Sequence, residues 1–503
     1  MKKHYFAKKV LQACLLFFMT ITTNMFAQVG IGTITPHASS VLDVSSTTQG
    51  MLTPRMTTAQ RVAIASPADG LMVYDTDLKS FYHYNSSLTS WNVINSGTTG
   101  RLKFKRIKST DVLATVLAAE KTAGGTTKYL LDTNTYYEIN GTIIFDLPID
   151  LNNAYVSGQD ANEDKLVRTS GNLFDGATGG SIRNVTIQVT GGGKVFNLSG
   201  TIAQNLIFRD TVIAGSSNVG SITGFGLVFV SIVQFVGNTT GIVYDSISKL
   251  LISNAAWFSN NAGTYEKLQG TFDLVQKQGG FSEVTGTSIG FDVSSDPIIT
   301  GDAVMESVVF TGVVSGVGAY VKPYTGVYVG YNFNNSWNVR CAGIPTEGDS
   351  FATGNLYDSN NTVASRTTAT NLNQAYKVVT NTTSTNNLFR VTSGTTGRLT
   401  YVGKKPRVFQ VNASLSFVES TAGNNTNYLF YIAKIASNGT TVTALPATET
   451  FLDTNSGFVQ AFPVTGTVQL NTNESVEVYL KRITNPSSAK INIDVYSLNM
   501  SIK

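Results

Sequence analysis

Short apolar runs separated by Gly, Asn, Ser and Thr recur along most of the chain, a pattern that favours β-strands over helices. Within residues 28–100, one segment has a helical pattern, 57–64, with Thr57 or Thr58 placed to cap it. The same region predicts a hairpin followed by one further strand, at residues 71–74, 81–84 and 91–94.

Residues 101–340 are rich in Gly, Asn and Thr and carry an internal repeat. Aligning Asn184 with Asn205 gives a step of about 21 residues, and Lys249 follows after two steps of about 22. Residues 226–229 fill the gap and residues 270–274 continue the series.

Such a period predicts a right-handed parallel β-helix, in which each coil covers the apolar interior of its neighbour. Asn184 and Asn205 would then form part of a side-chain amide ladder. The alternative is a pair of antiparallel β-sandwiches. The repeat and the absence of regular hairpin spacing argue against that alternative.

Residues 341–371 are polar and turn-rich, which predicts a linker. Alternating strands follow within 372–503 and predict an antiparallel jelly-roll or sandwich. These strands lie at 408–413, 428–435, 458–470, 475–483 and 491–502. The predicted fold class is therefore all-β, with a parallel β-helix between a small N-terminal segment and a jelly-roll domain.

The first 27 residues have the three parts of a Sec-type signal peptide: basic residues, a short apolar stretch and a polar exit ending at Ala27. No later window approaches the apolar length of a transmembrane helix. We therefore expect an exported protein, extracellular or on the outer cell surface. Cys14 lies too early in the apolar stretch to suit a lipidation site. Cleavage after Ala27 would remove it, and the one cysteine left in the mature chain, Cys341, is interpreted as a small hydrophobic residue.

Charge argues against nucleic acid as a partner. The chain has 36 Lys and Arg against 32 Asp and Glu, and four of the lysines lie in the acid-free signal segment, so the remainder is close to neutral. Only 14% of the residues are charged, which is typical of extracellular β structure rather than of a helical cytosolic enzyme.

The N-terminal region resembles a segment that recurs in exported surface proteins of Bacteroidota-type bacteria and beside phage tail-fibre modules. The resemblance implies a surface protein and identifies no chemistry. Its residues are Gly30-Ile31-Gly32-Thr33, Leu42-Asp43-Val44, Gly50-Met51-Leu52-Thr53-Pro54-Arg55-Met56-Thr57, Gln60-Arg61 and Gly70-Leu71.

Two further resemblances concern the β regions. Residues 136–143, 149–151 and 155–158 resemble the first coils of pectate-lyase-like β-helices and phage tailspikes. The closing segment 495–502 resembles the complement-globular-head (C1q) and tumour-necrosis-factor-like (TNF-like) domains that end bacterial and phage fibres. Because such heads are usually trimeric, the second resemblance implies a homotrimer.

The sequence offers few groups for catalysis. Beyond the signal segment the histidines are His37 and His83, both outside the two large β regions, so a Ser-His-Asp or Cys-His site would need a histidine from another domain. Clustered zinc ligands and nucleotide-binding loops are absent from the sequence. We assign no catalytic, cofactor-binding or metal-binding residue and expect no cofactor.

Carboxylates are the remaining route to an enzyme, and one cluster stands out, although a solvated loop is its simpler interpretation. It consists of Asp160, Glu163 and Asp164, with Lys165 and Arg168 nearby, plus Asp175. Tyr155, Tyr244 and Trp257 are the aromatic residues that would stack on sugar rings if exposed, and core filling is the equal alternative for each.

The function predicted from these observations is structural or adhesive: a secreted or cell-surface fibre that binds a glycan or another surface partner. The alternative is a polysaccharide lyase or glycoside hydrolase of the pectate-lyase-like class. Whether the chain is an enzyme stays open, and a domesticated phage tail-fibre protein is a third hypothesis that the signal peptide disfavours.

Overall fold

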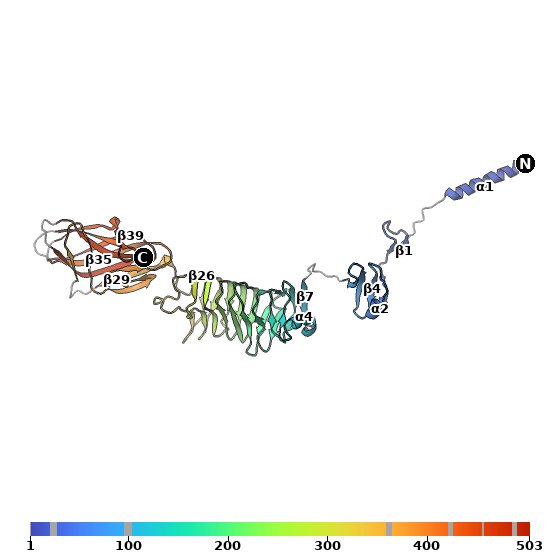
Figure 1. Cartoon of the computed structure of the whole chain (residues 1–503), viewed down its shortest axis with the longest axis horizontal. Helices are drawn as coiled ribbons and strands as arrows, with labels where there is room; N and C mark the ends of the chain where they lie inside the picture. The colour runs from blue at the N-terminus through green and yellow to red at the C-terminus, as the bar shows by residue number, and fades with distance from the viewer. Residues whose placement is uncertain are drawn as a thin grey trace. The chain divides into compact units, whose positions relative to one another are not determined.

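A computed structural model describes residues 2–20, 28–94, 103–358, 365–420, 426–454, 457–484 and 490–503 (Figure 1). The chain divides into two compact units, residues 1–100 and 101–503. Nearly all regular structure is β, with a parallel β-solenoid and a C-terminal antiparallel domain, which confirms the predicted fold class. The expected signal cleavage point after Ala27 lies outside the described residues.

The first unit combines a helix over part of the predicted signal segment with small sheets. Strands β1 and β2 pair in parallel, and β3, β4, β5 and β6 form a four-stranded sheet that contains the predicted hairpin. Thr57 caps α2 through a reciprocal capping box with Gln60, as the sequence predicts. The bounds are α1 Lys2–Thr20, β1 Val29–Ile31, β2 Leu42–Val44, β3 Arg55–Met56, α2 Thr58–Val62, β4 Met72–Asp75, β5 Ser80–Asn85 and β6 Ser90–Val93.

The solenoid begins the second unit and has about eight coils, seen between the labels α4 and β26 in Figure 1. Its strands pair in parallel in two sheets, which excludes the antiparallel sandwich alternative for this region. The thirteen-stranded sheet contains β7 Phe104–Lys108, β9 Tyr136–Asn140, β10 Thr142–Ile144, β12 Tyr155–Ser157, β13 Lys165–Arg168, β15 Gly180–Arg183, β16 Thr186–Val189, β18 Asn205–Ala214, β20 Leu227–Val236, β22 Lys249–Trp257, β24 Thr271–Glu283, β26 Ile298–Thr311 and β28 Trp337–Ala342. The nine-stranded sheet contains β8 Tyr129–Leu130, β11 Ile149–Asp150, β14 Phe174–Gly176, β17 Lys194–Ser199, β19 Asn218–Thr223, β21 Ile242–Asp245, β23 Thr264–Gln269, β25 Ile289–Asp292 and β27 Ala319–Lys322.

The register of neighbouring coils confirms part of the predicted repeat. Asn205 pairs with Leu227, and Leu227 pairs with Lys249, so both predicted steps of about 22 residues are correct. The step before them is wrong, because Ile182 pairs with Phe208 and Asn184 therefore does not lie opposite Asn205. The coil between them is longer, because its turns at 190–193 and 200–204 both have more residues than the corresponding turns of the next coil, 215–217 and 224–226.

An amide ladder does exist, but two coils further along. Asn238 donates from Nδ2 to Asn261 Oδ1 at 2.9 Å, and the backbone N–H of Ser216 donates to Asn238 Oδ1 at 3.0 Å. All three side chains are buried. The ladder satisfies the backbone groups of a coil corner that water cannot reach.

Asn184 instead occupies a bend that recurs in six successive coils. At each bend the backbone takes a left-handed conformation, with φ between 52° and 64°. Such a φ favours Gly, Asn and Asp and penalises β-branched residues. The residues at the bend are Asn184, Asp210, Ile232, Asn254, Gly279 and Ser307.

One continuous apolar stack fills the solenoid. The Trp257 ring lies parallel to Phe235 at a centroid distance of 3.9 Å and to Tyr265 at 5.1 Å. Cys341 packs half-buried against this core, and burial raises the pKa of its thiol, in agreement with its interpretation as a hydrophobic residue. Two short helices, α3 Leu113–Val116 and α4 Ala118–Ala123, cover the first coil.

The C-terminal domain consists of two antiparallel sheets around a second core. One sheet has the order β29-β41-β35-β39 and the other contains β34-β40-β36, with β38 on β36. Counted along the chain, these eight strands alternate between the sheets as 1-8-3-6 and 2-7-4-5, the strand order of a jelly roll. Their bounds and those of the smaller elements are η1 Asp349–Phe351, β29 Thr353–Asp358, β30 Ser365–Ala369, β31 Ala375–Lys377, β32 Ser384–Phe389, β33 Val391–Thr392, β34 Leu399–Tyr401, β35 Arg407–Glu419, β36 Thr426–Ile435, β37 Val442–Ala444, η2 Pro446–Thr448, β38 Thr450–Thr454, β39 Val459–Leu470, β40 Ser475–Arg482 and β41 Ile491–Ile502.

The predicted linker 341–371 needs correction. It contains β29 and β30, both of which pair with β41 and so belong to the jelly roll. Their polar composition misled the prediction because the outward residues of an exposed strand are as polar as those of a turn. The predicted strands further along are confirmed as β35, β36, β39, β40 and β41.

Candidate functional site

A shallow cavity of about 440 Å³ lies on the outer face of the thirteen-stranded sheet, toward the first coils. We call it the solenoid groove. Its floor is a row of outward residues in register on four neighbouring strands. The lining residues are Tyr136, Tyr155, Ser181, Arg183, Ile207 and Arg209.

The alternation of side chains along each strand places these residues outside. Their neighbours Tyr137, Val156 and Ile182 point into the core and are buried. Tyr155 is 48% exposed. The ring of Phe104, on the strand before, lies nearly parallel to Tyr136 at 6.0 Å, so aromatic rings continue beyond the groove. The result is a row of outward aromatic side chains on three neighbouring strands, which offers apolar contact area to a ligand.

Two arginines stand side by side in the groove. Arg183 and Arg209 are register partners on β15 and β18, and neighbouring strands are about 4.8 Å apart. Arg183 Nε donates to Ser157 Oγ at 3.3 Å, and its guanidinium lies 5.9 Å from the Tyr136 ring centre. Like charges on opposite strand positions destabilise a sheet, so this pair favours a bound anion.

One acid accompanies the pair. Asp210 Oδ2 lies 3.3 Å from Arg209 Nε, and both side chains are partly exposed. Glu138, which lies in the same row opposite Ser157, is already paired with Arg106 at 2.7 Å. Two guanidinium groups against the Asp210 carboxylate therefore leave a positive excess in the groove. An exposed ion pair such as Arg209–Asp210 is weak enough to be exchanged for a ligand.

The carboxylate cluster of the sequence analysis lies on the same solenoid, but its members support the backbone. Asp164 is buried and accepts from the backbone N–H of Gly141 at 2.8 Å, Gln159 at 2.6 Å and Asp160 at 3.1 Å. Asp160 accepts from the N–H of Asn162, and Glu163 is exposed in the same loop. Their geometry is that of a loop anchor.

The other three residues of the cluster, Lys165, Arg168 and Asp175, also belong to the framework of the solenoid. Lys165 begins β13, and Arg168 is buried and donates to the Phe145 carbonyl at 3.2 Å. Burial lowers the pKa of Arg168, although the negative charges of Asp146 and Asp175 act in the opposite direction. Asp175 accepts from the amides of Asn172 and Asn197. Asp160 and Asp164 meet through a backbone N–H of Asp160, and not as a pair of facing carboxylates.

Of the three aromatic residues proposed to stack on sugars, one is available. Tyr155 lines the groove, whereas Tyr244 and Trp257 are fully buried in the solenoid core. Sequence reasoning missed the two groove arginines. Their separation of 26 residues departs from the 22-residue step, so only the true register brings them together.

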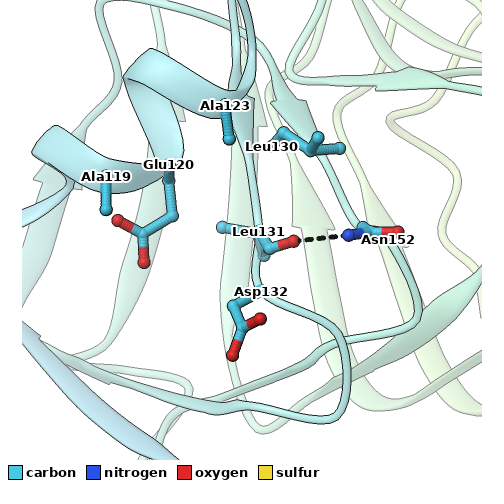
Figure 2. Close-up of a pocket in the computed structure, with 7 residues that line it drawn as sticks. All are labelled: Ala119, Glu120, Ala123, Leu130, Leu131, Asp132 and Asn152. Atoms are coloured by element: carbon cyan, nitrogen blue, oxygen red, sulfur yellow. Dashed lines mark hydrogen bonds between the residues drawn. The ribbon is translucent and has the colours of Figure 1, made fainter.

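A second cavity, of about 280 Å³, lies beneath the cap of the first coil (Figure 2). Most of its polar groups are engaged: Glu120 Oε1 accepts from Lys105 at 2.5 Å and from the Tyr137 hydroxyl at 2.8 Å, and Asn152 Nδ2 donates to the Leu131 carbonyl at 2.8 Å. Among the described residues, Glu120 Oε2 is buried without a hydrogen-bond partner. Burial raises the pKa of Tyr137, which therefore stays a hydrogen-bond donor. This cavity belongs to the cap.

Within the described residues, no group of three or more His, Cys, Asp or Glu side chains is arranged to hold a metal ion. The helices that the structure describes include none long and apolar enough to cross a membrane.

Comparisons with known proteins complete this picture. Residues 30–110 match the family described as "Phage tail like trimerisation region", a match that begins within the predicted N-terminal segment 28–100 and ends after β7. No curated protein matches the chain. Among solved structures, Eiger TNF from S. frugiperda is similar to 30% of this chain over 92% of its own length, with 11% identity and a TM-score of 0.22.

Proposed function

We propose that the chain is one subunit of a homotrimeric, exported fibre that binds an acidic glycan at the solenoid groove. The trimerisation-region match supports the trimer, and the solenoid supports a fibre-like structural role. Export and a place outside the cell are proposed from the N-terminal sequence alone.

The register partners Arg183 and Arg209 carry the glycan proposal. A carboxylate or sulfate group between their guanidinium groups would relieve the repulsion between them. The adjoining rings of Tyr136 and Tyr155 supply the faces for sugar stacking. Because the groove is open along the sheet, it suits an internal stretch of a polymer better than a single small molecule.

The test is co-sedimentation of the purified full chain with a panel of polysaccharides that differ in charge, while the polymer chain length is followed. Retention on carboxylated or sulfated polymers, with weaker retention on neutral ones, is the expected result. Retention that is independent of polymer charge, or none at all, would overturn the proposal. Shortened polymer would instead favour the lyase or hydrolase alternative, which stays a prediction.

A trimer makes this site multivalent. Three identical grooves on one fibre would bind one polymer with an avidity well above the affinity of each groove. The same preparation therefore needs its mass measured in solution by light scattering. A mass three times that of the 53.8 kDa chain, less any removed signal segment, is expected.

A further inference from the structure

A lysine and a glutamate face each other inside the solenoid. Lys277 Nζ, from β24, lies 2.6 Å from Glu266 Oε2, from β23, and both side chains are completely buried. The chain turns from one strand to the next at Gly270, where φ is 77°, so the two side chains meet across the interior of a single coil.

Apolar side chains of the adjacent coils separate this pair from water along both sheets. Lys277 lies in register between Ile252 and Met305 on the adjacent coils. Glu266 lies in register between Ile242 and Phe291. All four neighbours are buried, so neither charge has a path to water.

The pair also lacks the hydrogen bonds that normally accompany buried charges. Within the described part of the chain, Lys277 Nζ and both carboxylate oxygens of Glu266 have no hydrogen-bond partner, and their mutual contact lacks hydrogen-bond geometry. An ion pair in an apolar interior is favourable only when further hydrogen bonds satisfy its atoms. Proton transfer from the ammonium to the carboxylate removes both charges and leaves an amine against a carboxylic acid.

We propose that Lys277 and Glu266 condense into an intramolecular amide bond that crosslinks the coil. The Lys277 Nζ lone pair attacks Glu266 Cδ, the new C–N bond forms, and a C–O bond of the acid breaks. The hydroxyl leaves with one amine proton as water, so atoms and electrons balance without an oxidant, a reductant or a co-reactant. The product has one neutral amide in place of the buried amine and the buried carboxylic acid.

The fold supplies what this reaction needs. Holding two reactants in contact gives effective concentrations of about 10⁵–10⁸ M, which favours condensation over hydrolysis in a site without water. The Tyr244 hydroxyl is buried, has no hydrogen-bond partner among the described residues and senses the Glu266 carboxylate. Burial raises its pKa well above the ordinary value, so the phenol keeps a proton that it can lend to the departing hydroxyl.

Peptide mapping of the purified full chain tests the bond directly. Trypsin cuts after Lys267, so Glu266 and Lys277 fall in different tryptic peptides unless the bond joins them. The expected product is one branched peptide, in which the peptide ending at Lys267 is joined to the peptide that contains Lys277. Its mass is lower than the sum of the two peptides by one water molecule, and it is not cut after Lys277. Separate, unmodified peptides, or a water loss that maps to other residues, would overturn the proposal.

Two controls keep the test independent of folding defects. Lys277→Arg retains the positive charge without the amine nucleophile, and it should give separate peptides. The Lys377–Glu477 pair of the jelly roll is an internal control in the unaltered protein. Its atoms are 2.5 Å apart, as close as those of the buried pair, but Lys377 is 30% exposed and Glu477 has Arg398 as a second partner at 2.8 Å. It should stay unlinked, and a water loss at both pairs would overturn the requirement for a sealed site.

Discussion

Arg61 Nε donates to Asp75 Oδ2 at 2.9 Å in the first unit, where both side chains are buried. The Arg61 guanidinium also lies 4.0 Å from the Tyr82 ring centre. Asp75 additionally accepts from the Thr58 hydroxyl and from the backbone N–H of Leu78. The pair therefore ties α2 to the hairpin β4–β5, within the segment that matches the trimerisation region.

This relationship predicts acid sensitivity of the first unit. Burial alone would raise the pKa of Asp75, but the donors from Leu78, Arg61, Thr58 and Asp77 lower it from 3.8 to about 2. A carboxyl with a depressed pKa stabilises the fold above its unfolded value, and that contribution disappears as the pH falls from about 4 to about 2. Hydrogen exchange across residues 55–93 should show protection lost over that interval.

Asp75→Asn removes the titrating group and is the matched variant. It should lower the exchange protection already at pH 7, because Arg61 loses its charged partner, and it should flatten the pH dependence. Protection that falls with the same midpoint in the variant would show that another group governs the acid transition.

The solenoid groove predicts additive losses of binding. Arg183→Ala and Arg209→Ala should each weaken binding of an acidic polymer about tenfold, since one charge-assisted hydrogen bond contributes about 1.5 kcal/mol. Arg340→Ala is the control, because Arg340 is exposed in the same outward row and lies opposite Glu306 rather than another arginine. Binding isotherms at low and high salt would measure all three. An equal effect of the control would point to non-specific charge.

The recurrent bend predicts a stabilising substitution. Ile232 has φ 53° and is 53% exposed, so it carries the strain of a left-handed β-branched residue and gains little from burial. Ile232→Asn, the residue found at the same bend at position 254, should raise the free energy of unfolding by about 1 kcal/mol. Ile232→Val keeps the β-branch and should bring no gain. Denaturant unfolding, followed by tryptophan fluorescence in a Trp91→Phe background, reports on the solenoid through Trp257 and Trp337.

The buried amide ladder predicts that removing one of its asparagines lowers the free energy of unfolding. Asn238→Ala removes the acceptor of the Ser216 N–H and the donor to the Ile213 carbonyl, leaving both buried groups unsatisfied. We expect a loss of about 2–3 kcal/mol in the same unfolding measurement. The control is Asn260→Ala, since Asn260 accepts from the Gly237 N–H at an exposed position. Equal losses for both variants would contradict a special role of the buried ladder.

Sequence patterns predicted the elements of this chain better than their pairing. The capped helix at 58–62 and the strands of the jelly roll follow local rules, because capping and alternation depend on near neighbours. The step from Ile182 to Phe208 was misread because Asn184 and Asn205 look alike in sequence, although one occupies a left-handed bend and the other begins β18.

The same limit applies to the candidate sites. Tyr155 was visible in the sequence as a candidate stacking residue, whereas Arg183 and Arg209 become a site only when the register is known. Lys277 and Glu266 would each be taken for solvated residues, because single charged residues in strands usually point outward. The turn between β23 and β24 brings both side chains into the interior of one coil, where they meet.

The jelly roll closes the last coil of the solenoid. Arg390 donates to the Trp337 carbonyl of β28 and to Asp349, and the Tyr331 ring stacks on Phe389 at 3.9 Å. A parallel sheet that ended bare would offer its free backbone groups to any passing strand, and identical shafts would join end to end. We therefore expect the terminal domain, which contacts the last strand β28, to hinder end-to-end pairing of identical shafts.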